Sequence, residues 1–269
     1  MTVDLDGAGV VVTGAGRGIG AALARAFAAE GARLVLADLD GAAVESVARE
    51  LGAVAVPGDA AGEDGVRALV SRAREELGDI DLYCGNAGIA EHGGPEAPEE
   101  AWARSWDVNV MAHVRAAREL LPRWLERGRG HLLVTASAAG LLTNLGSAPY
   151  SVTKHGAVAF AEWFAATYRH HGVGAQALCP QGVRTALLEE AGPAGQALLG
   201  ADAIEPEDVA AAVLEGLRDG RFLILPHPEV AEYYTRRATD TDRWLGGMNK
   251  LQRRIEDAVG GPSGRGDLG

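Results

Sequence analysis

The chain has 269 residues, 47% of them hydrophobic, and its formal net charge of −12 argues against nucleic acid or anionic membranes as partners. Its two cysteines, Cys84 and Cys179, have no CxxC spacing, so we expect no disulfide framework and no metal site, and a reducing cytoplasm fits. The polar residues 1–6 do not resemble a signal peptide, and no run of about 18 apolar residues predicts a membrane span.

Short apolar runs alternate with longer helical patterns along the whole chain. Strands are predicted at residues 10–13, 33–37, 53–57, 81–84, 131–136, 173–178 and 222–225. Helices are predicted around residues 21–30, 42–51, 64–77, 99–127, 150–171 and 207–219. Because the strands are apolar throughout rather than alternating, they predict a parallel sheet covered by helices on both faces, an α/β fold of three layers.

No linker interrupts this series, so residues 1–260 are predicted to form a single domain. Residues 182–205 lack a strand and are rich in Ala, Gly and Leu, which indicates a substrate loop or lid. Residues 227–257 add a helical extension after the last predicted strand, and residues 261–269 are predicted to be a flexible tail.

The first predicted strand leads directly into a glycine-rich turn, TGAGRGIG at residues 13–20, and then into an alanine-rich helix. Gly14, Gly18 and Gly20 would let the backbone approach a pyrophosphate, for which the helix N-terminus supplies amide donors and a positive dipole. A tight turn without a ligand is the alternative. The position of the turn after the first strand favours a nucleotide site.

Asp38 ends the second predicted strand, eighteen residues after Gly20. A carboxylate there accepts hydrogen bonds from the ribose hydroxyls of NAD and repels the 2′-phosphate of NADP. Leu39 follows it, so no basic residue is supplied at that point, whereas Arg17 in the glycine turn suits NADP. Placing a carboxylate beside a phosphate is costly, so NAD is favoured and NADP is the alternative.

Tyr150 and Lys154 are four residues apart in a predicted helix and therefore share one face. Lysine is scarce in this chain, which has only Lys154 and Lys250, so this spacing is more informative than usual. A solvated helix face is the alternative. Ser137, thirteen residues before Tyr150 at the end of the fifth predicted strand, favours a site, because ligands bind at the carboxyl ends of strands in open α/β sheets.

The energetics allow acid–base chemistry at Tyr150. Lowering the pKa of a tyrosine from about 10 to near neutrality requires about 4 kcal/mol. A cation about 4 Å away, at an effective dielectric constant of about 20, supplies about 4 kcal/mol. Lys154, helped by the charge of an oxidised nicotinamide, would therefore make Tyr150 a general base in oxidation and a general acid in reduction. Ser137 would donate a hydrogen bond to the substrate oxygen.

From about residue 5 to residue 225 the chain resembles the classical short-chain dehydrogenase/reductase family. The resemblance rests on motifs in matching order: TGAGRGIG at 13–20, GNAG at 85–88, the Asn109 of DVNV, Ser137, YxxxK at 150–154 and PQGVRT at 180–185. It implies a Rossmann-type, doubly wound sheet of seven parallel strands in the order 3-2-1-4-5-6-7. It also implies a catalytic tetrad of Asn109, Ser137, Tyr150 and Lys154, in which Asn109 holds a water that links Lys154 to solvent.

The resemblance also implies where the cofactor binds. Asp59 would bind the adenine amine, and Val183 and Thr185 would hold the carboxamide. The predicted cofactor-binding residues are Gly14, Arg17, Gly18, Ile19, Gly20, Asp38, Leu39, Asp59, Ala60, Asn86, Ala87, Gly88, Tyr150, Lys154, Pro180, Gly182, Val183 and Thr185. The chain departs from the family at Gly85, where asparagine is common, and at Gln181, which interrupts a usual Pro-Gly and would project toward the substrate.

The predicted substrate pocket is mostly apolar and is formed by Ala139, Leu141, Leu142, Leu145, Gln181, Leu187 and Leu188. We therefore expect an NAD-dependent oxidoreductase that interconverts a hydrophobic or cyclic secondary alcohol and its ketone by direct hydride transfer. The alternatives are an NADP-dependent carbonyl or 3-ketoacyl reductase and a non-catalytic nucleotide-binding regulator, although the complete tetrad disfavours the regulator. The resemblance further suggests a homotetramer, with a homodimer as the alternative.

Overall fold

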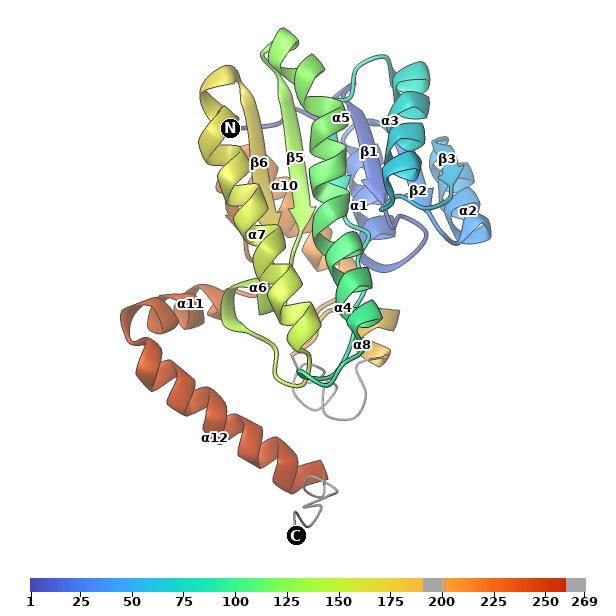
Figure 1. Ribbon diagram of the computed structural model, residues 1–269. Helices are drawn as coiled ribbons and strands as arrows, with labels where there is room; N and C mark the ends of the chain where they lie inside the picture. The colour runs from blue at the N-terminus through green and yellow to red at the C-terminus, as the bar shows by residue number, and fades with distance from the viewer. Residues whose placement is uncertain (191–199, 201, 260–269) are drawn as a thin grey trace.

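The computed structural model describes residues 1–190, 200 and 202–259. It has one sheet of seven strands: β1 (Gly9–Thr13), β2 (Arg33–Asp38), β3 (Val54–Pro57), β4 (Leu82–Gly85), β5 (Gly130–Thr135), β6 (Val173–Leu178) and β7 (Leu223–Ile224). All neighbouring strands pair in parallel, in the order β3-β2-β1-β4-β5-β6-β7 (Figure 1). This confirms the predicted fold class and strand order.

Helices cover both faces of the sheet. One face carries α1 (Gly18–Ala29), α2 (Gly41–Leu51) and α10 (Pro206–Asp219). The other carries α3 (Glu63–Leu77), α5 (Ala112–Arg127) and α7 (Ala148–Tyr168), which Figure 1 shows in front of the strands. Successive residues of β1 enter opposite hydrophobic clusters, Val11 on one face and Val10 and Val12 on the other. Burial on both faces is why most strand positions are apolar, with His131 in β5 and Gln176 in β6 among the exceptions.

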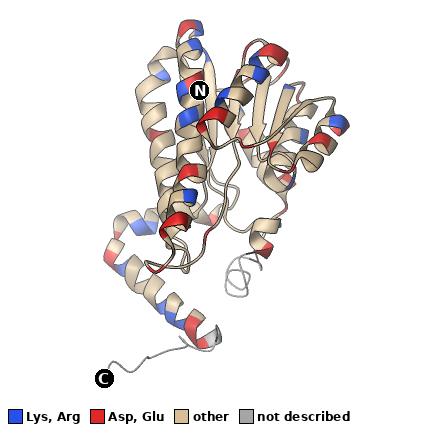
Figure 2. Ribbon diagram, turned by 45° about the vertical axis from the view of Figure 1, so that its right-hand side comes forward, with Lys and Arg blue, Asp and Glu red and all other residues tan. Residues whose placement is uncertain are grey.

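Charged side chains lie mainly on the outside of the molecule. Acidic and basic residues are interspersed over the outer helices, whereas the strands are uncharged except for Arg33 and Asp38 at the two ends of β2 (Figure 2). No helix in the described part of the chain is long and apolar enough to cross a membrane.

The helix predicted over residues 99–127 is confirmed with these bounds, although it is not regular throughout. The segment consists of α4 (Glu99–Trp106), a π-helical turn η1 (Asp107–Met111) and then α5. A π turn inserts an extra residue, which rotates the next helical turns about the axis, and such turns are frequent at functional sites. Asn109 lies in this turn.

Other segments also differ from the predictions. Short helices α6 (Ala139–Leu142) and α8 (Ala186–Glu189) form where none was predicted, β7 has only two residues, and the 3-10 helix η2 (Arg169–His171) ends the predicted helix 150–171. Within the predicted loop 182–205, Val183 forms a parallel bridge with Ile204. Residues 191–199 and 201 of that loop, and the predicted tail 261–269, lie outside the described residues.

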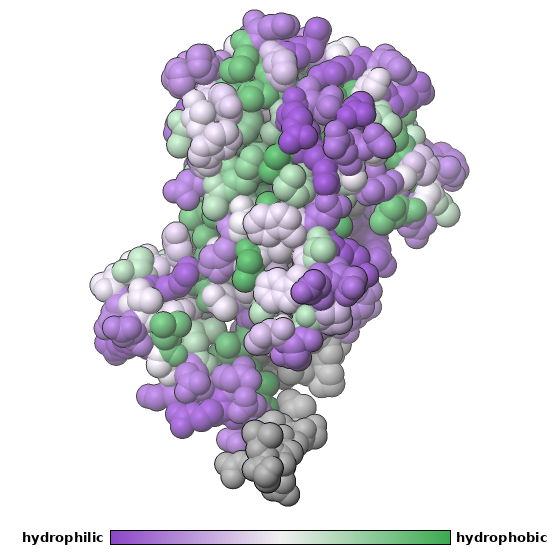
Figure 3. All heavy atoms as spheres, in the orientation of Figure 1, coloured by the Kyte–Doolittle hydropathy of each residue, from purple (hydrophilic) through white to green (hydrophobic). Residues whose placement is uncertain are grey.

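After β7 the chain continues into two helices, α11 (Glu229–Thr239) and α12 (Thr241–Val259). Helix α11 lies against the body near α6, and α12 then runs outward from it (Figure 1). Hydrophobic residues gather in the angle between the body and these helices, and hydrophilic residues cover much of the outer surface of α12 (Figure 3).

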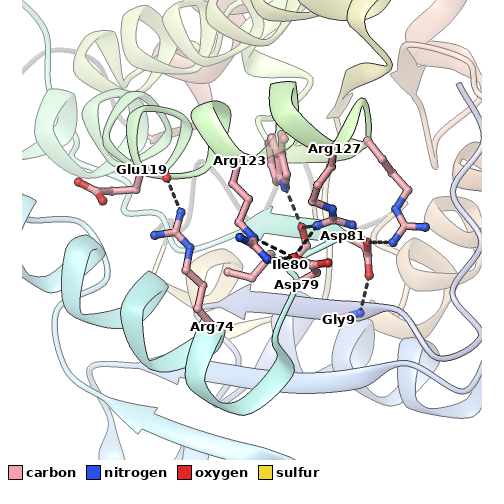
Figure 4. A network of polar contacts seen from close by, with 10 residues as sticks. Gly9, Arg74, Asp79, Ile80, Asp81, Glu119, Arg123 and Arg127 are labelled. Atoms are coloured by element: carbon pink, nitrogen blue, oxygen red, sulfur yellow. Dashed lines mark hydrogen bonds and ion pairs between the residues drawn. The ribbon is translucent and has the colours of Figure 1, made fainter.

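A polar network holds α5 in place at the amino ends of β1 and β4 (Figure 4). Arg127 forms an ion pair with Asp81 at 2.5 Å, and the other carboxylate oxygen of Asp81 accepts the amide hydrogen of Gly9 at 2.9 Å. Trp124 Nε1 donates to the carbonyl of Ile80 at 2.7 Å. These contacts fix α5 relative to the sheet at the end opposite to η1, and so help to place Asn109.

Candidate active site

The glycine turn between β1 and α1 depends on the absence of side chains. Gly14 has φ +64° in the left-handed region, which glycine adopts without steric cost. A Cβ on Gly20 would lie 2.0 Å from the carbonyl oxygen of Gly14, so only glycine fits where the helix begins to pack on the turn. No described side chain caps the N-terminus of α1, so its first amides are free to bind an anion.

The carboxylate of Asp38 lies at the mouth of this turn. Its Oδ2 accepts the amide hydrogen of Gly16 at 2.8 Å, and its Oδ1 accepts that of Asp40 at 3.0 Å. Leu39 beside it is 77% exposed and lines the cleft. Arg17 also lines the cleft, and its side chain makes no hydrogen bond or ion pair with any described residue. The site therefore contains both the acidic and the basic group on which the choice between NAD and NADP depends.

The GNAG segment after β4 is joined to the glycine turn by Thr13. The Thr13 hydroxyl oxygen accepts the amide hydrogens of Asn86 and Ala87, each at 3.0 Å. Asn86 Nδ2 donates to the Thr13 carbonyl at 3.1 Å and to the Gly14 carbonyl at 3.3 Å. Because β1 and β4 are neighbours, the two turns form one continuous surface.

Helix α7 places Tyr150 and Lys154 at the carboxyl end of β5. Lys154 is buried, donates from Nζ to the carbonyl oxygen of Thr135 at 3.0 Å, and lies 5.6 Å from the centroid of the Tyr150 ring. Ser137 Oγ accepts the amide hydrogen of Ala139 at 3.1 Å and donates to the Pro180 carbonyl at 3.4 Å, and it lines the same cleft as Tyr150 and Lys154. Three of the four predicted catalytic residues therefore meet at one point.

Burial is the main cause of the pKa shifts of Tyr150 and Lys154. It lowers the pKa of Lys154 to about 8 and raises the pKa of Tyr150, and the nearby Ser137 hydroxyl opposes the rise at Tyr150. From the sequence we expect Lys154 to lower the Tyr150 pKa, but the ammonium lies against the ring and points its hydrogen bond at Thr135. With these contacts alone, the phenol form of Tyr150 is the favoured one.

Asn109 lies behind the cleft rather than in its wall. Its Oδ1 accepts the amide hydrogen of Ile89 at 3.0 Å, and its Nδ2 donates to the Ile89 carbonyl at 3.0 Å and to Thr153 Oγ1 at 3.1 Å. A Cβ on Gly88 would lie 3.2 Å from both Asn109 Oδ1 and Lys154 Nζ, so these two groups flank the glycine. The contacts give Asn109 a positioning role, and its water-holding role stays a prediction.

The segment predicted to hold the carboxamide, Val183 to Thr185, follows the end of β6. Ile204 accepts the amide hydrogen of Arg184 at 2.9 Å and donates to the Gly182 carbonyl at 3.1 Å, so the N–H of Val183 between them faces away from Ile204. Thr185 Oγ1 donates to the Val183 carbonyl at 3.2 Å. Thr185 also approaches the glycine turn, since a Cβ on Gly18 would lie 3.0 Å from its methyl group.

One cleft of about 1430 Å³ connects these groups. Of the predicted site residues, those that line it are Gly14, Arg17, Gly18, Ile19, Asp38, Leu39, Asp59, Ala60, Asn86, Ala87, Gly88, Ser137, Ala139, Leu142, Leu145, Tyr150, Lys154, Pro180, Gln181, Gly182, Val183, Thr185, Leu187 and Leu188. Gly20, Asn109 and Leu141 are buried behind its walls. Among the described residues, no group of three or more His, Cys, Asp or Glu side chains could hold a metal ion.

Asp59 and Gln181 have distinct environments within this cleft. The carboxylate of Asp59 accepts the amide hydrogens of Ala61 at 2.8 Å and Gly62 at 3.1 Å, which holds it at the β3 end of the cleft. The Oε1 atom of Gln181 is buried and has no hydrogen-bond partner among the described residues. An unpaired buried acceptor calls for a donor, so Gln181 is suited to a polar group of a ligand.

Sequence reasoning missed His227, which clamps the turn after β6. This buried histidine accepts the amide hydrogen of Gln181 at Nδ1 (3.2 Å), and its Nε2 lies 3.1 Å from the carbonyl of Gly182. Both contacts are satisfied by the tautomer that carries the proton on Nε2. The available signal was the Pro-His-Pro sequence at 226–228, which restricts the backbone on both sides of the ring.

Comparisons with known proteins identify the family of the chain. The family model for short chain dehydrogenases matches residues 8–195. The chain is 40% identical over 229 residues to the 1-deoxy-11-beta-hydroxypentalenate dehydrogenase of Streptomyces exfoliatus, covering 81% of this chain and 82% of that protein. It is 32% identical over 230 residues to epidermal retinol dehydrogenase 2 of Homo sapiens, covering 81% and 73% respectively.

A solved structure shows the same fold. The crystal structure of a short chain dehydrogenase/reductase from Burkholderia phymatum in complex with NAD superposes with a TM-score of 0.80 at 32% identity, covering 90% of this chain and 96% of that chain. The resemblance predicted from the motifs is therefore confirmed. The chain belongs to the short-chain dehydrogenase family of oxidoreductases.

Proposed function

We propose that this protein is an NAD-dependent dehydrogenase that interconverts a hydrophobic secondary alcohol and its ketone. The observation that carries the proposal is that one cleft joins the glycine turn and Asp38 to Tyr150, Ser137 and Lys154. A nucleotide site and an acid–base group in one cavity are what hydride transfer between a dinucleotide and an alcohol requires.

The residues fit a dinucleotide cofactor. The bare backbone of the glycine turn and the uncapped N-terminus of α1 suit the pyrophosphate, and the amide of Val183, which faces away from Ile204, suits the carboxamide. Asp38 suits the ribose hydroxyls of NAD. The bound nicotinamide would supply the carbon that exchanges hydride with the substrate. The Burkholderia phymatum relative was crystallised with NAD, which supports this assignment.

Tyr150 would take the hydroxyl proton of the alcohol in oxidation and return it in reduction. Ser137, held by its hydrogen bonds with Ala139 and Pro180 and lining the cleft with Tyr150, would orient the substrate oxygen beside the phenol. Because burial raises the Tyr150 pKa, phenolate formation depends on nearby positive charge. Lys154 supplies such a charge at 5.6 Å from the ring centroid.

The substrate side of the cleft is largely apolar. Leu142, Leu145, Leu187 and Leu188 line it together with the C-terminal helices. Two relatives are named as dehydrogenases of 1-deoxy-11-beta-hydroxypentalenate and of retinol, which supports an alcohol substrate. We therefore propose a ring-containing, apolar alcohol as the substrate class.

NADP dependence is the second candidate, and Arg17 favours it. This side chain lines the cleft and, within the described residues, has no partner that neutralises its charge. Asp38, which is fixed by two backbone amides beside the expected ribose position, opposes it. A carboxylate held rigidly there repels a 2′-phosphate, whereas a long arginine is free to turn to solvent, so NAD is preferred.

We also propose a homotetramer in which α4 and α7 contribute an interface. Three large apolar side chains on these helices are exposed, Trp106 at 46%, Val152 at 48% and Trp163 at 55%. Exposed aromatic residues of this size are enriched in protein–protein interfaces. Light scattering tests this proposal, and the mass of a monomer would contradict it.

The experiment for the enzymatic proposal measures NADH formation by absorbance. Purified protein with NAD⁺ is offered a graded series of secondary alcohols, from 2-propanol through cyclohexanol to a fused-ring 3-hydroxysteroid. The proposal predicts turnover that increases with apolar ring area. Tight NAD⁺ binding without NADH formation from any alcohol, and without NADH consumption by the ketones, would favour a non-catalytic nucleotide-binding protein instead.

A further inference from the structure

We propose that α12 forms the outer wall of the substrate chamber and selects for alcohols with a large, rigid apolar body. The inference rests on the proposed function and adds to it the residues that determine substrate size. These residues are Trp244, Met248 and Leu251, which follow β7 and lie outside the sheet and its covering helices.

The sequence of α12 places these three side chains on one face. They are separated by four and then three residues, the spacing of a helical stripe. All three line the cleft that contains Tyr150, and all three are only partly exposed. Between them, Leu245 is turned away from the cleft and is 58% exposed. The helix therefore has one apolar face that borders the cleft and one face toward solvent.

Helix α11 attaches the first turn of α12 to the body of the molecule. Arg237 of α11 donates a hydrogen bond to the carbonyl oxygen of Leu141 in α6. Tyr233 of α11 contacts Trp244 at the start of α12, with ring centroids 6.3 Å apart, and both rings pack against the main hydrophobic cluster. Tyr233 also lines the cleft. The wall is thus anchored to the body at its first turn, while its later turns border the chamber.

The occupant that suits this wall is the substrate itself. The wall is continuous with the apolar side chains of α6 and α8 that surround the reacting end, among them Leu142 and Leu188. A ligand that holds its hydroxyl at Tyr150 and extends along this cleft would contact Met248 and Leu251, which line it as well. A small alcohol fills only the end near Tyr150 and leaves α12 without a contact. The geometry therefore favours fused-ring or similarly extended apolar alcohols over small ones.

The chain offers a matched pair of substitutions for the test. Leu251→Ala and Leu245→Ala remove the same atoms from the same helix, but only Leu251 lines the cleft. The measured quantity is the ratio of kcat/KM for a fused-ring 3-hydroxysteroid to kcat/KM for cyclohexanol, both with NAD⁺. We expect L251A to lower this ratio about tenfold, the loss expected for one leucine-sized apolar contact, and L245A to leave it unchanged.

A second variant separates a lost contact from a lost helix. Gly246 and Gly247 lie within α12, and a Cβ on either one meets no described atom within 4 Å, so alanine is accepted there and favours the helix. If L251A only loosened α12, adding Gly246→Ala and Gly247→Ala would restore the ratio and overturn the proposal. The inference predicts that the low ratio persists.

Two further readouts keep the outcomes distinct. Calorimetric titration of the steroid ketone into each variant with NADH present tests the wall without turnover, so failure of every alcohol as a substrate counts against the proposed function alone. Equal ketone affinity in L251A and L245A would contradict the proposal that α12 contacts the substrate. If L251A changes the molecular mass in light scattering while the ratio stays constant, α12 instead packs against a second copy of the chain, which also overturns it.

Discussion

The ring of His113 in α5 occupies the space that a side chain at position 85, the last residue of β4, would need. A Cβ built on Gly85 would lie 2.4 Å from Nδ1 of His113. The ring is fully buried, and neither of its nitrogens has a hydrogen-bond partner among the described residues. The family commonly has asparagine at position 85. Here glycine leaves the space that is filled by His113, four residues after Asn109.

This pairing predicts that Gly85→Asn destabilises the protein by about 1–3 kcal/mol, the usual cost of overpacking a core. In the double variant with His113→Ala, the smaller side chain makes room and the cost of the asparagine falls. Urea denaturation of the wild type, both single variants and the double variant measures the coupling. Strictly additive free energies of unfolding would contradict the pairing.

The buried histidines predict sensitivity to acid. Burial lowers the pKa of His113 to about 3 and that of His131 to about 4, so both are neutral when folded and bind protons readily only when unfolded. Their contribution to stability is complete above pH 6.5 and is lost as the pH falls toward 4, by up to about 1.4 kcal/mol per pH unit for each histidine. Urea denaturation at neutral pH and at two pH values between about 6 and 4 measures this slope.

Replacing one of them supplies the comparison for that slope. His113→Leu removes one titrating group from the core, so the acid slope is expected to fall toward that of His131 alone. An unchanged slope in this variant would show that His113 is not responsible for the acid sensitivity.

Asp38 is predicted to set the cofactor preference. Asp38→Asn removes the charge but keeps an oxygen that accepts the amide hydrogen of Gly16, so we expect kcat/KM with NADP⁺ to rise relative to NAD⁺ by about tenfold or more. The control is Asp40→Asn, a neighbouring carboxylate whose Oδ1 caps α2 through Ala43. An equal effect of the two substitutions would point to net charge rather than to a contact at position 38.

His227 is predicted to act as a positioning residue. His227→Phe keeps the ring volume but releases both the amide of Gln181 and the carbonyl of Gly182, which costs about 1–3 kcal/mol of stability. Because the turn also borders the cleft, we expect a higher KM for the dinucleotide and a lower kcat. His170→Phe, at an exposed site, serves as the control. Loss of stability with unchanged kinetics would restrict His227 to a structural role.

The strands and the glycine turn were predictable from sequence because their residues follow local rules. Strands buried on both faces are apolar at most positions, and Gly20 is required by its own backbone contact with Gly14. The π turn at Asn109 was not predictable, since the segment 99–127 has an ordinary helical pattern. The hydrogen bonds between Asn109 and Ile89 that accompany it exist only in the folded protein.

Other features were not predictable because they depend on contacts between distant residues. His113 and Gly85 are 28 positions apart, and nothing local to either one indicates the steric contact between them. The apolar stripe of α12 has a recognisable period, but its direction depends on how Arg237 docks α11 onto α6. For Tyr150, the spacing to Lys154 gives an approximate distance but not the degree of burial, which in the structure raises the Tyr150 pKa.

The most direct measurement of the acid–base role is the single-turnover rate of Tyr150→Phe with NAD⁺ and a saturating cyclic alcohol, alongside NAD⁺ affinity determined by calorimetry. Removing one hydroxyl leaves the ring and its contact with Lys154 in place. We expect unchanged NAD⁺ affinity and a rate reduced by at least about 100-fold, the typical contribution of a general acid–base group. A rate within a few-fold of the wild type would contradict the role assigned to Tyr150.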